Sequence, residues 1–369
     1  MEYKPDWEKA RARYEAFWND EELERCLLWV ISYRSRSQRS LLLHNPHMPN
    51  YQIEVTRDEE LLRRWTDFDF LLSYHQEVFS CLYYAAEALP VFWINLGPGV
   101  MAAFLGSDPE FRKDTVWFHP SLGSLQNLAP KFNPENRWWK LTISLTAQAA
   151  KAGAGRFFVG VTDLGGAGDI LAHLRGPGEL CIDLMEQKEK IKEIECTIMD
   201  MWIACYEELY QLIVQRGSLV SHWLGTWAPG KHYPIQCDFS AMISPKMFQE
   251  VFVPSLCKQA RYLDYPIYHL DGPGAIKHLP ILLSIEEIKA IQWVPGDGAP
   301  RILNWIPLLQ RIQASGRKVI TYASPEEALE AIRYLEPSKT MFFIDQPLNS
   351  IEEAEGFIQS MSARCQERR

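Results

Sequence analysis

PIYHLDGPG, at residues 266–274, is a short apolar run that ends in polar residues and a turn. Its Ile, Tyr and Leu residues favour a buried β-strand, and the Gly-Pro-Gly that follows favours a sharp turn. Side chains two residues apart on a strand point to the same side, so His269 and Asp271 are expected to project together. The segment therefore predicts a pair of functional side chains at the carboxyl end of a strand.

Seven other segments of the chain share this character. The eight candidate strands begin at Leu27, Val91, Arg156, Ser218, Pro266, Ile288, Lys318 and Met341. Helical patterns occupy residues 58–72, 138–152, 178–216, 244–263, 275–283, 304–314, 324–335 and 350–362. Regular alternation of this kind predicts an α/β fold with parallel strands, and eight units predict closure into a (β/α)8 TIM barrel. An open, doubly wound sheet is the alternative.

The first residues differ from the rest, because they contain no strand candidate and begin with the charged, amphipathic sequence MEYKPDWEKARARYEAFW. We therefore expect an N-terminal helical extension at residues 1–26 and a single barrel domain at residues 27–369.

Three of the later helices have clear start signals. A serine precedes proline or acidic residues at Ser244, Ser324 and Ser350, where it can cap the amides of a first helical turn.

The composition narrows the class of function. The chain of 369 residues is 47% hydrophobic and 23% charged, which is typical of a folded protein with a large core. A net charge of -9 without any Lys/Arg-rich run argues against nucleic-acid or membrane partners, and no stretch approaches the roughly 18 apolar residues of a membrane span. We expect a cytoplasmic protein that acts on a small molecule.

Cofactor motifs that can be recognised in a sequence are missing. No GxGxxG follows an early strand and no GxxxxGK is followed by Ser or Thr, so neither NAD nor ATP is expected. The eight cysteines include no CxxC pair, which argues against a disulfide framework and against a zinc knuckle.

The strongest candidates for chemistry are His269 and Asp271. A neutral imidazole beside a carboxylate can bind a divalent metal or act as an oriented acid/base pair. Cys237 and Asp238, in CDFSAMISP, lie near the same end of a neighbouring strand, and one of the two can face the site. With Cys237, the pair would give sulfur, nitrogen and oxygen ligands suited to zinc. The alternative is structural: a satisfied core histidine, a turn-capping aspartate and a buried cysteine.

Other polar and aromatic residues follow the remaining strands. Asp163 and Asp169 flank Gly165-Gly166, and we assign Asp163 to the site and Asp169 to the N-cap of the following helix. Asn95, Trp227, Trp293 and Tyr322 are candidates for the wall of a substrate pocket, although core packing is an alternative for the three aromatic residues. Arg34, Arg36 and Arg39 could hold carboxylates or could lie in a solvated loop.

Three longer segments carry a resemblance to a known family. CDFSAMISPKMFQEVFVPSL (237–256), YHLDGPGAIKHL (268–279) and TDLGGAGDILAHLRGPGELCIDLMEQKEKIKEI (162–194) are similar to segments of the uroporphyrinogen decarboxylase superfamily. The resemblance covers roughly residues 91–362 and implies a TIM barrel. Dimers are common in this superfamily, so a homodimer is one possibility that the resemblance raises.

The superfamily contains two kinds of enzyme. Uroporphyrinogen decarboxylases use no cofactor and bind carboxylates with an early Arg-Gln-Ala-Gly-Arg-Tyr motif, whereas this chain has YRSRSQRS after its first strand candidate. The other branch consists of corrinoid-linked methyltransferases, which hold zinc with His-x-Cys and a distant cysteine near the final strand. In this chain His269 and Asp271 stand where those enzymes have His-x-Cys. Near the final strand, where they have the distant cysteine, the nearest candidate ligand is Asp345, in FIDQP.

The resemblance therefore implies transfer of a methyl group between a small substrate or thiol and a cobamide carried by a partner protein, with zinc as the metal. Zinc would act as a Lewis acid that keeps a thiol as thiolate. A cofactor-independent decarboxylase acting on a carboxylated, tetrapyrrole-like substrate is the first alternative. A non-catalytic barrel that binds a small molecule is the second.

Overall fold

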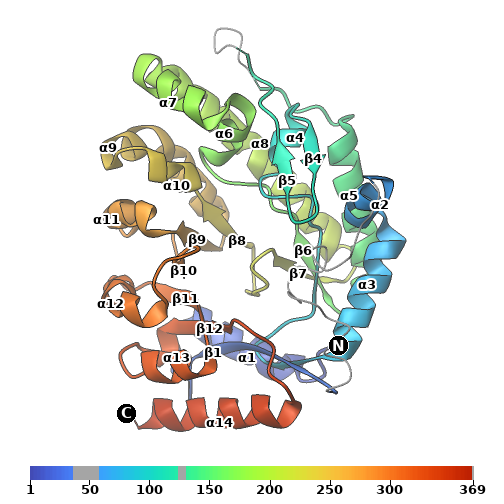
Figure 1. The fold of residues 1–369 in the computed structure, drawn as a ribbon, viewed down its shortest axis with the longest axis vertical. Coiled ribbons are helices and arrows are strands. Elements are labelled where there is room, and N and C mark those ends of the chain that lie inside the picture. The colour runs from blue at the N-terminus through green and yellow to red at the C-terminus, as the bar shows by residue number, and fades with distance from the viewer. Residues whose placement is uncertain (36–57, 124–129, 368–369) are drawn as a thin grey trace.

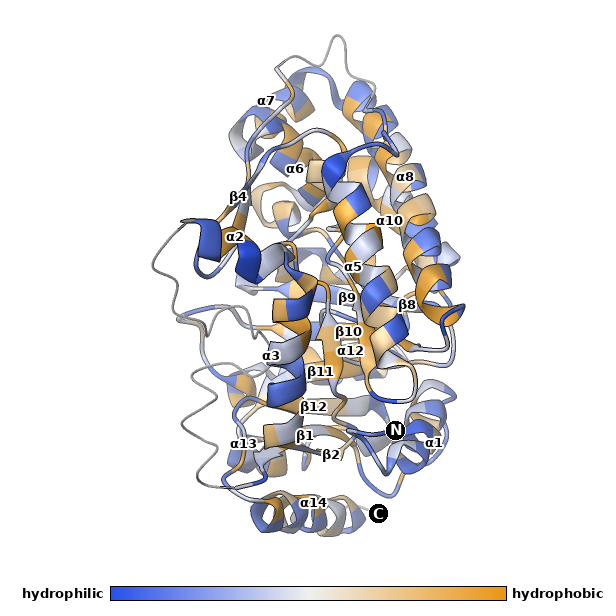
Figure 2. Ribbon diagram, turned by 90° about the vertical axis from the view of Figure 1, so that its right-hand side faces the viewer, coloured by the Kyte–Doolittle hydropathy of each residue, from blue (hydrophilic) through white to orange (hydrophobic). Residues whose placement is uncertain are grey.

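The structure is a computed structural model, and it describes residues 1–35, 58–123 and 130–367. Parallel strands lie at its centre, and helices surround them on the left, lower and right sides of the view in Figure 1. Figure 2 shows hydrophobic residues at the centre, around β10 and β11, whereas helices α3, α5 and α8 carry both hydrophilic and hydrophobic residues. Among the described helices, none combines the length and the apolar character that a membrane span requires.

The larger sheet has seven strands in the order β2-β1-β12-β11-β10-β9-β8. All neighbouring strands in it are parallel except β1 and β2, which are antiparallel. Its members are β1 (Leu27–Tyr33), β2 (Leu82–Ala86), β8 (His232–Gln236), β9 (Tyr265–Asp271), β10 (Ala290–Val294), β11 (Lys318–Ala323) and β12 (Thr340–Ile344). The expectation of an α/β fold with parallel strands is confirmed.

A second, three-stranded sheet is also parallel and has the order β3-β6-β7. It contains β3 (Val91–Trp93), β6 (Phe158–Val161) and β7 (Leu219–His222). A separate hairpin joins β4 (Pro109–Phe111) to β5 (Val116–Phe118). Each of the eight segments expected to form strands contains one, but β2, β4, β5 and β8 were not expected.

The two sheets are separated between β7 and β8. A loop was expected there, after the fourth strand candidate. Instead the chain leaves β7, turns at residues 223–231 and forms β8 on the edge of the larger sheet. Pro234 lacks an N–H, which suits an edge strand. Within the described residues, no strand pairing joins β7 to β8 or β3 to β2. Closure into a ring of eight strands therefore stays a prediction.

The helices follow the expected order, but several of the expected helical segments are divided. The pattern at residues 58–72 is divided into α2 (Asp58–Thr66) and α3 (Phe68–Cys81), because the side chain of Asp67 accepts a hydrogen bond from the Phe70 amide and starts a new helix. The pattern at residues 178–216 becomes α7 (Pro177–Glu186) and α8 (Lys188–Val214).

The other described helices are α1 (Trp7–Trp18), α4 (Met101–Phe104), α5 (Arg137–Gly153), α6 (Asp169–Arg175), α9 (Pro245–Met247), α10 (Val253–Tyr262), α11 (Leu279–Leu282), α12 (Ile306–Ala314), α13 (Pro325–Ala331) and α14 (Ile351–Gln366). The three expected serine caps are confirmed. Ser244, Ser324 and Ser350 each accept a hydrogen bond from the amide three residues later, at the start of α9, α13 and α14.

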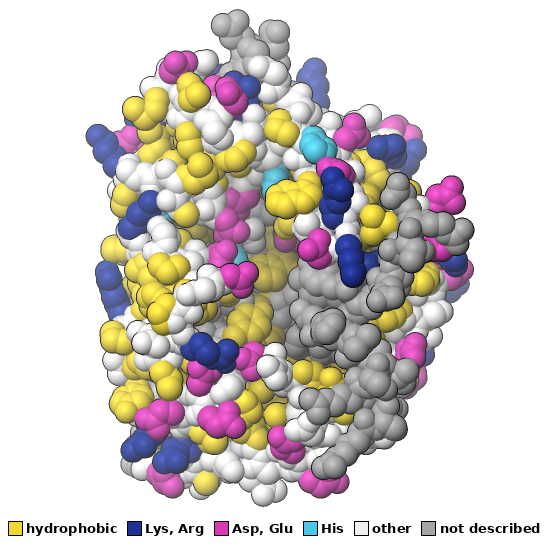
Figure 3. Space-filling model, in the orientation of Figure 1, with side chains coloured by type: hydrophobic (Ala, Val, Ile, Leu, Met, Phe, Trp, Pro, Cys, Tyr) yellow, Lys and Arg dark blue, Asp and Glu magenta, His cyan; other side chains and the backbone are white. Residues whose placement is uncertain are grey.

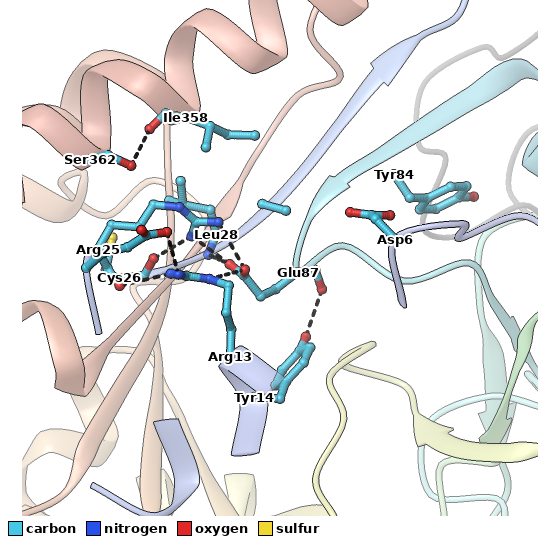
Figure 4. A network of polar contacts seen from close by, with 12 residues as sticks. Asp6, Arg13, Tyr14, Arg25, Cys26, Leu28, Tyr84, Glu87, Ile358 and Ser362 are labelled. Carbon is cyan, nitrogen blue, oxygen red and sulfur yellow. Dashed lines mark hydrogen bonds and ion pairs between the residues drawn. The ribbon is translucent and has the colours of Figure 1, made fainter. Parts of the chain in front are cut away.

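The helical extension is joined to the strands by a buried ionic network (Figure 4). Glu87, which follows β2, has no exposed surface and receives two hydrogen bonds from the Arg25 guanidinium, at 2.8 and 3.0 Å. Arg13 of α1 donates to the same carboxylate at 2.7 Å, and the Leu28 amide does so at 2.7 Å. The Tyr14 hydroxyl donates to the backbone carbonyl of Glu87 at 2.9 Å.

Burial alone would raise the pKa of Glu87, but the charges of Arg25 and Arg13 and the hydrogen bonds that Glu87 accepts lower that pKa to about 2. The carboxylate is therefore ionised at neutral pH. Its charge compensates two arginines that reach it from different parts of the chain.

We expect Glu87→Gln to lower the free energy of unfolding by ~3–5 kcal/mol, because it leaves the buried Arg25 guanidinium without its paired carboxylate. Urea denaturation at neutral pH measures this change. Glu24→Gln is the matched control, since Glu24 pairs with the same Arg13 at 2.8 Å but is exposed to solvent. The control should cost less than about 1 kcal/mol. Equal effects of the two substitutions would contradict the role assigned to Glu87.

The same network predicts how stability depends on pH. The pKa of Glu87 falls from 4.5 in the unfolded chain to about 2 in the folded one. This difference corresponds to about 3 kcal/mol at about 1.4 kcal/mol per pKa unit. The contribution is fully present above pH 4.5 and is lost as the pH falls towards 2. The difference in unfolding free energy between the wild type and Glu87→Gln should narrow over that range, and a constant difference would contradict the assignment.

Candidate functional site

The candidate site is built on neighbouring strands whose side chains are in register. His269 on β9 is aligned with Gln236 on β8 and with Gln292 on β10. Residues aligned across parallel strands project to the same side of a sheet, and Asp271, two residues after His269, projects to that side as well. The pair in PIYHLDG therefore shares one face, as the alternation along the strand predicts.

The imidazole of His269 has a fixed orientation. Its Nδ1 lies 2.6 Å from Oε1 of Gln292, and its ring stands edge-on to the ring of Trp223, with 5.2 Å between the centroids. An amide oxygen only accepts hydrogen bonds, so in the neutral form of the ring the proton lies on Nδ1 and the lone pair on Nε2. This is the arrangement that presents Nε2 to a metal or to a substrate proton.

Three side chains converge at the carboxyl ends of β8 and β9. Asp238, His269 and Asp271 each offer a ligand atom, and the three atoms lie within 4.8 Å of one another. Asp238 begins the 3-10 helix η4 (Asp238–Met242), directly after β8. Both carboxylates are exposed and the histidine is half-buried. In the part of the chain that the structure describes, this is the one such group of three or more His, Cys, Asp or Glu residues.

The position of Asp238 raises its pKa to about 7, through burial first and then through the negative charges of Asp271 and Asp163. The carboxylate is nonetheless in contact with solvent, so it lies at the surface rather than in the core. Figure 3 draws the face of the molecule that is seen in Figure 1. It shows a hollow at the centre of that face, with acidic and histidine side chains on its wall and hydrophobic side chains within it. Carboxylates crowded in this way attract a cation.

The structure places Asp238, and not Cys237, in this group. Successive residues at the end of a strand point in opposite directions, so one of the two had to face away. Cys237 is 1% exposed, and its Sγ lies near Gly168, behind the group. Burial raises the pKa of the Cys237 thiol well above its ordinary value, and the nearby carboxylates of Asp169 and Glu195 add to that effect. Cys237 is a buried thiol in this structure.

Asp163, which follows β6, lies close enough to His269 for their charges to interact. It is 7% exposed, and its Oδ1 accepts a hydrogen bond from the Gly165 amide at 2.8 Å. Burial raises its pKa to about 6, although the bonds from the Gly165 and Gly99 amides and the charge of His269 act in the opposite direction. The structure thus brings Asp163 to the side on which His269 and Asp271 project.

The assignment of Asp169 as an N-cap is wrong. Gly168 is the N-cap of α6, and Asp169 is the first residue inside the helix. Its carboxylate instead accepts hydrogen bonds from the amides of Phe239 at 2.8 Å and Asp238 at 3.1 Å, which belong to η4. The sequence around Asp169 suggested a hydrogen bond to the start of its own helix, but the bonded amides belong to η4, about 70 residues later in the chain.

Two of the expected pocket residues pack elsewhere. Trp227 lies against α1, with its ring centroid 5.0 Å from that of Trp7, so it belongs to the core beneath the extension. Trp293 is fully buried and packs on Trp305, at 5.0 Å between centroids. Its neighbour Gln292 is the residue that reaches His269. A glutamine within the apolar strand AIQWV is the signal that could have identified it.

The remaining candidates have defined partners. The Asn95 side chain accepts a hydrogen bond from the Gly97 amide at 3.1 Å and so supports the turn after β3. Tyr322 lies beside Phe343, at 5.4 Å between centroids, and Phe343 stacks on Trp29 at 5.5 Å. Two residues before Tyr322, Ile320 is aligned with Gln292, so Tyr322 faces the same side as His269.

Asp345 follows β12 and is paired with a cation. Its carboxylate accepts a hydrogen bond from Arg301 at 2.6 Å, and the same guanidinium binds Glu327. Asp345 is not a member of the group of three ligand atoms. Arg34 donates its Nε to the Leu82 carbonyl at 2.8 Å, whereas residues 36 and 39 lie outside the described part of the chain.

The turn after β6 approaches the end of β8 so closely that only glycine fits. A Cβ on Gly166 would lie 2.0 Å from the carbonyl oxygen of Gln236. A contact of that kind cannot be relieved by rotating a side chain, because the atom met is backbone.

We therefore expect Gly166→Ala to destabilise the fold by ~1–3 kcal/mol or more and to displace the end of β8. Gly178→Ala is the control, since nothing lies within 4 Å of a Cβ there and Gly178 is in helix α7, where alanine is favoured. Thermal unfolding of both variants measures the difference. A Gly166 variant as stable as the control would contradict the close approach.

Comparison with known proteins shows likeness at the level of fold. No protein-family model matches the chain, and no curated protein matches it. Among solved structures, the chain is similar to a methyltransferase from Methanosarcina mazei, with a TM-score of 0.56 and 10% sequence identity. The match covers 97% of this chain and 98% of that one, so the two share their fold over nearly the whole length.

Proposed function

We propose that this protein is a methyltransferase whose strands form a (β/α)8-type barrel and whose site lies at Asp238, His269 and Asp271. The observation that carries the proposal is the convergence of these three ligand atoms, within 4.8 Å of one another, at the carboxyl ends of neighbouring parallel strands. The full-length likeness to a methyltransferase from Methanosarcina mazei supports the reaction class.

The donor set fits a divalent cation. Two carboxylate oxygens and one imidazole nitrogen suit zinc and also harder ions such as manganese or iron(II). His269 would bind through Nε2, because its Nδ1 is occupied by Gln292 at 2.6 Å. Bound there, the ion would supply a Lewis acid that stabilises the deprotonated form of the methyl acceptor, such as a thiolate.

The protein side chains would orient the reactants and limit the access of water. Trp223 covers one edge of the His269 ring, and Gln292 prevents that ring from turning. Tyr322 and Phe343 supply an apolar wall on the side to which His269 projects, suited to a small methylated molecule. The proposed methyl donor or acceptor is a cobamide carried by a separate protein.

A decarboxylase acting on a substrate with several carboxylates fits the site less well. The carboxylate of Asp238 interacts there with the charges of Asp271 and Asp163, and a polyanionic substrate would add to this repulsion. Among the cations near the strand ends, Arg301 is paired with Glu327 and Asp345, and Lys277 donates to the Ala241 carbonyl at 2.9 Å. The arrangement therefore favours methyl transfer over the decarboxylase alternative.

We expect wild-type protein, purified without chelator, to bind about one divalent ion per chain, and His269→Ala to weaken that binding by at least ~10–100-fold, the range typical of disturbed metal sites. Metal analysis and calorimetric titration with Zn²⁺ and Mn²⁺ measure both. His119→Ala is the control, because His119 is exposed, pairs with Glu110 of β4 and is not a member of the group of three ligand atoms.

The reaction is tested with methylcobalamin and a thiol acceptor, by following the absorbance change that accompanies loss of the methyl group from cobalt. Wild type and His119→Ala should demethylate the cobamide, and His269→Ala should not. A metal-free wild type that instead releases CO2 from a carboxylated tetrapyrrole would replace this proposal with the decarboxylase.

A further inference from the structure

The turn DLGGAGD, at residues 163–169, contacts several elements around the site. The Trp202 indole of α8 donates to the Gly165 carbonyl at 3.0 Å. The Gly168 amide donates to Oε1 of Glu195, also on α8, at 2.9 Å. Gly166 lies against the Gln236 carbonyl at the end of β8. The turn is thus held from behind by a long helix and touches the strand that leads to Asp238.

Asp169 ends this turn, and its carboxylate reaches η4. It is 7% exposed, and its two oxygens separately accept the amides of Phe239, at 2.8 Å, and of Asp238, at 3.1 Å. The Gln236 side chain adds a longer contact at 3.4 Å. The first amides of any helix lack partners within it, so this carboxylate caps η4 from another part of the chain.

These contacts hold the main chain of Asp238, which is a proposed metal ligand. The side chain of Asp238 belongs to the group with His269 and Asp271, while its amide is bound by Asp169. Fixing the amides of residues 238 and 239 fixes the direction in which the Asp238 side chain leaves the backbone. We propose that Asp169 is a positioning residue, which aims the Asp238 carboxylate at the cation site by holding the first turn of η4.

This inference rests on the proposed function, because it assigns a role within the same site. It adds a residue that does not itself touch the ion or the substrate. Partners that hold metal ligands in place contribute substantially to metal affinity, and their loss typically weakens binding by ~10–100-fold. Loss of the Asp169 carboxylate should therefore be visible in the affinity and in the geometry of the bound metal.

The test is titration of the metal-free full-length protein with Co²⁺, followed by its visible absorption, which reports the number and arrangement of ligands. We expect Asp169→Ala to bind Co²⁺ ~10–100-fold more weakly than the wild type and with an altered spectrum. Asp169→Asn keeps one oxygen that can accept the Phe239 amide, so it should recover part of the affinity. Asp183→Asn is the control, because Asp183 is a buried carboxylate that pairs with Arg175 at the other end of α6.

The outcomes separate the two proposals. Co²⁺ bound by wild type and Asp169→Ala with the same affinity and spectrum overturns the positioning role alone. An asparagine variant no better than the alanine variant also overturns it, since the hydrogen bonds to η4 would then not account for the effect. A wild type that binds no Co²⁺ overturns the proposed function and the positioning role together.

Amide hydrogen exchange of the wild type provides a measurement that requires no variant to fold. The amides of Asp238 and Phe239 should exchange slowly, as donors to a buried carboxylate. Rapid exchange of both amides would overturn the positioning role.

Discussion

The contact between the Gly165-Gly166 turn and the end of β8 is the constraint on which the site depends. Backbone meets backbone there, with the Gln236 carbonyl in the space that a side chain on Gly166 would fill. This approach brings the β6–α6 connection beside β8, so that Asp163 can face His269 and Asp169 can bind the amides of η4. Gly165 and Gly166 have no functional side chains, but their close approach to β8 determines the positions of the Asp163, Asp169 and Asp238 carboxylates.

The buried ionic network and the candidate site lie in different parts of the molecule. The Glu87 network joins α1, the start of β1 and the end of β2, and its charges are fully paired. At the opposite ends of the strands, acidic groups lie together without such compensation, and their pKa values are raised. An α/β protein commonly divides its residues in this way, because the carboxyl ends of parallel strands carry the active site and the other ends carry packing.

The sequence was informative where structure depends on local patterns. Period-two alternation identified His269 and Asp271 as a pair on one face, and serine followed by proline or acid identified helix starts at Ser244, Ser324 and Ser350. The strand segments were found for the same reason, since β-branched and aromatic runs bounded by turn residues are a local property. The α/β class follows from these elements alone.

Contacts between distant segments could not be read in this way. The segment before Cys237 was taken as a connection, and without the strand β8 nothing decides whether Cys237 or Asp238 faces the site. The bond from Asp169 to η4 and that from Gln292 to His269 each join residues of different elements. The same holds for Trp227, which an approaching N-terminal helix covers.

The ligand set has a chemical consequence. Oxygen and nitrogen donors cannot form disulfides or sulfinic acids, so a centre built from two aspartates and a histidine would not lose its ligands to the thiol oxidation that disables cysteine sites.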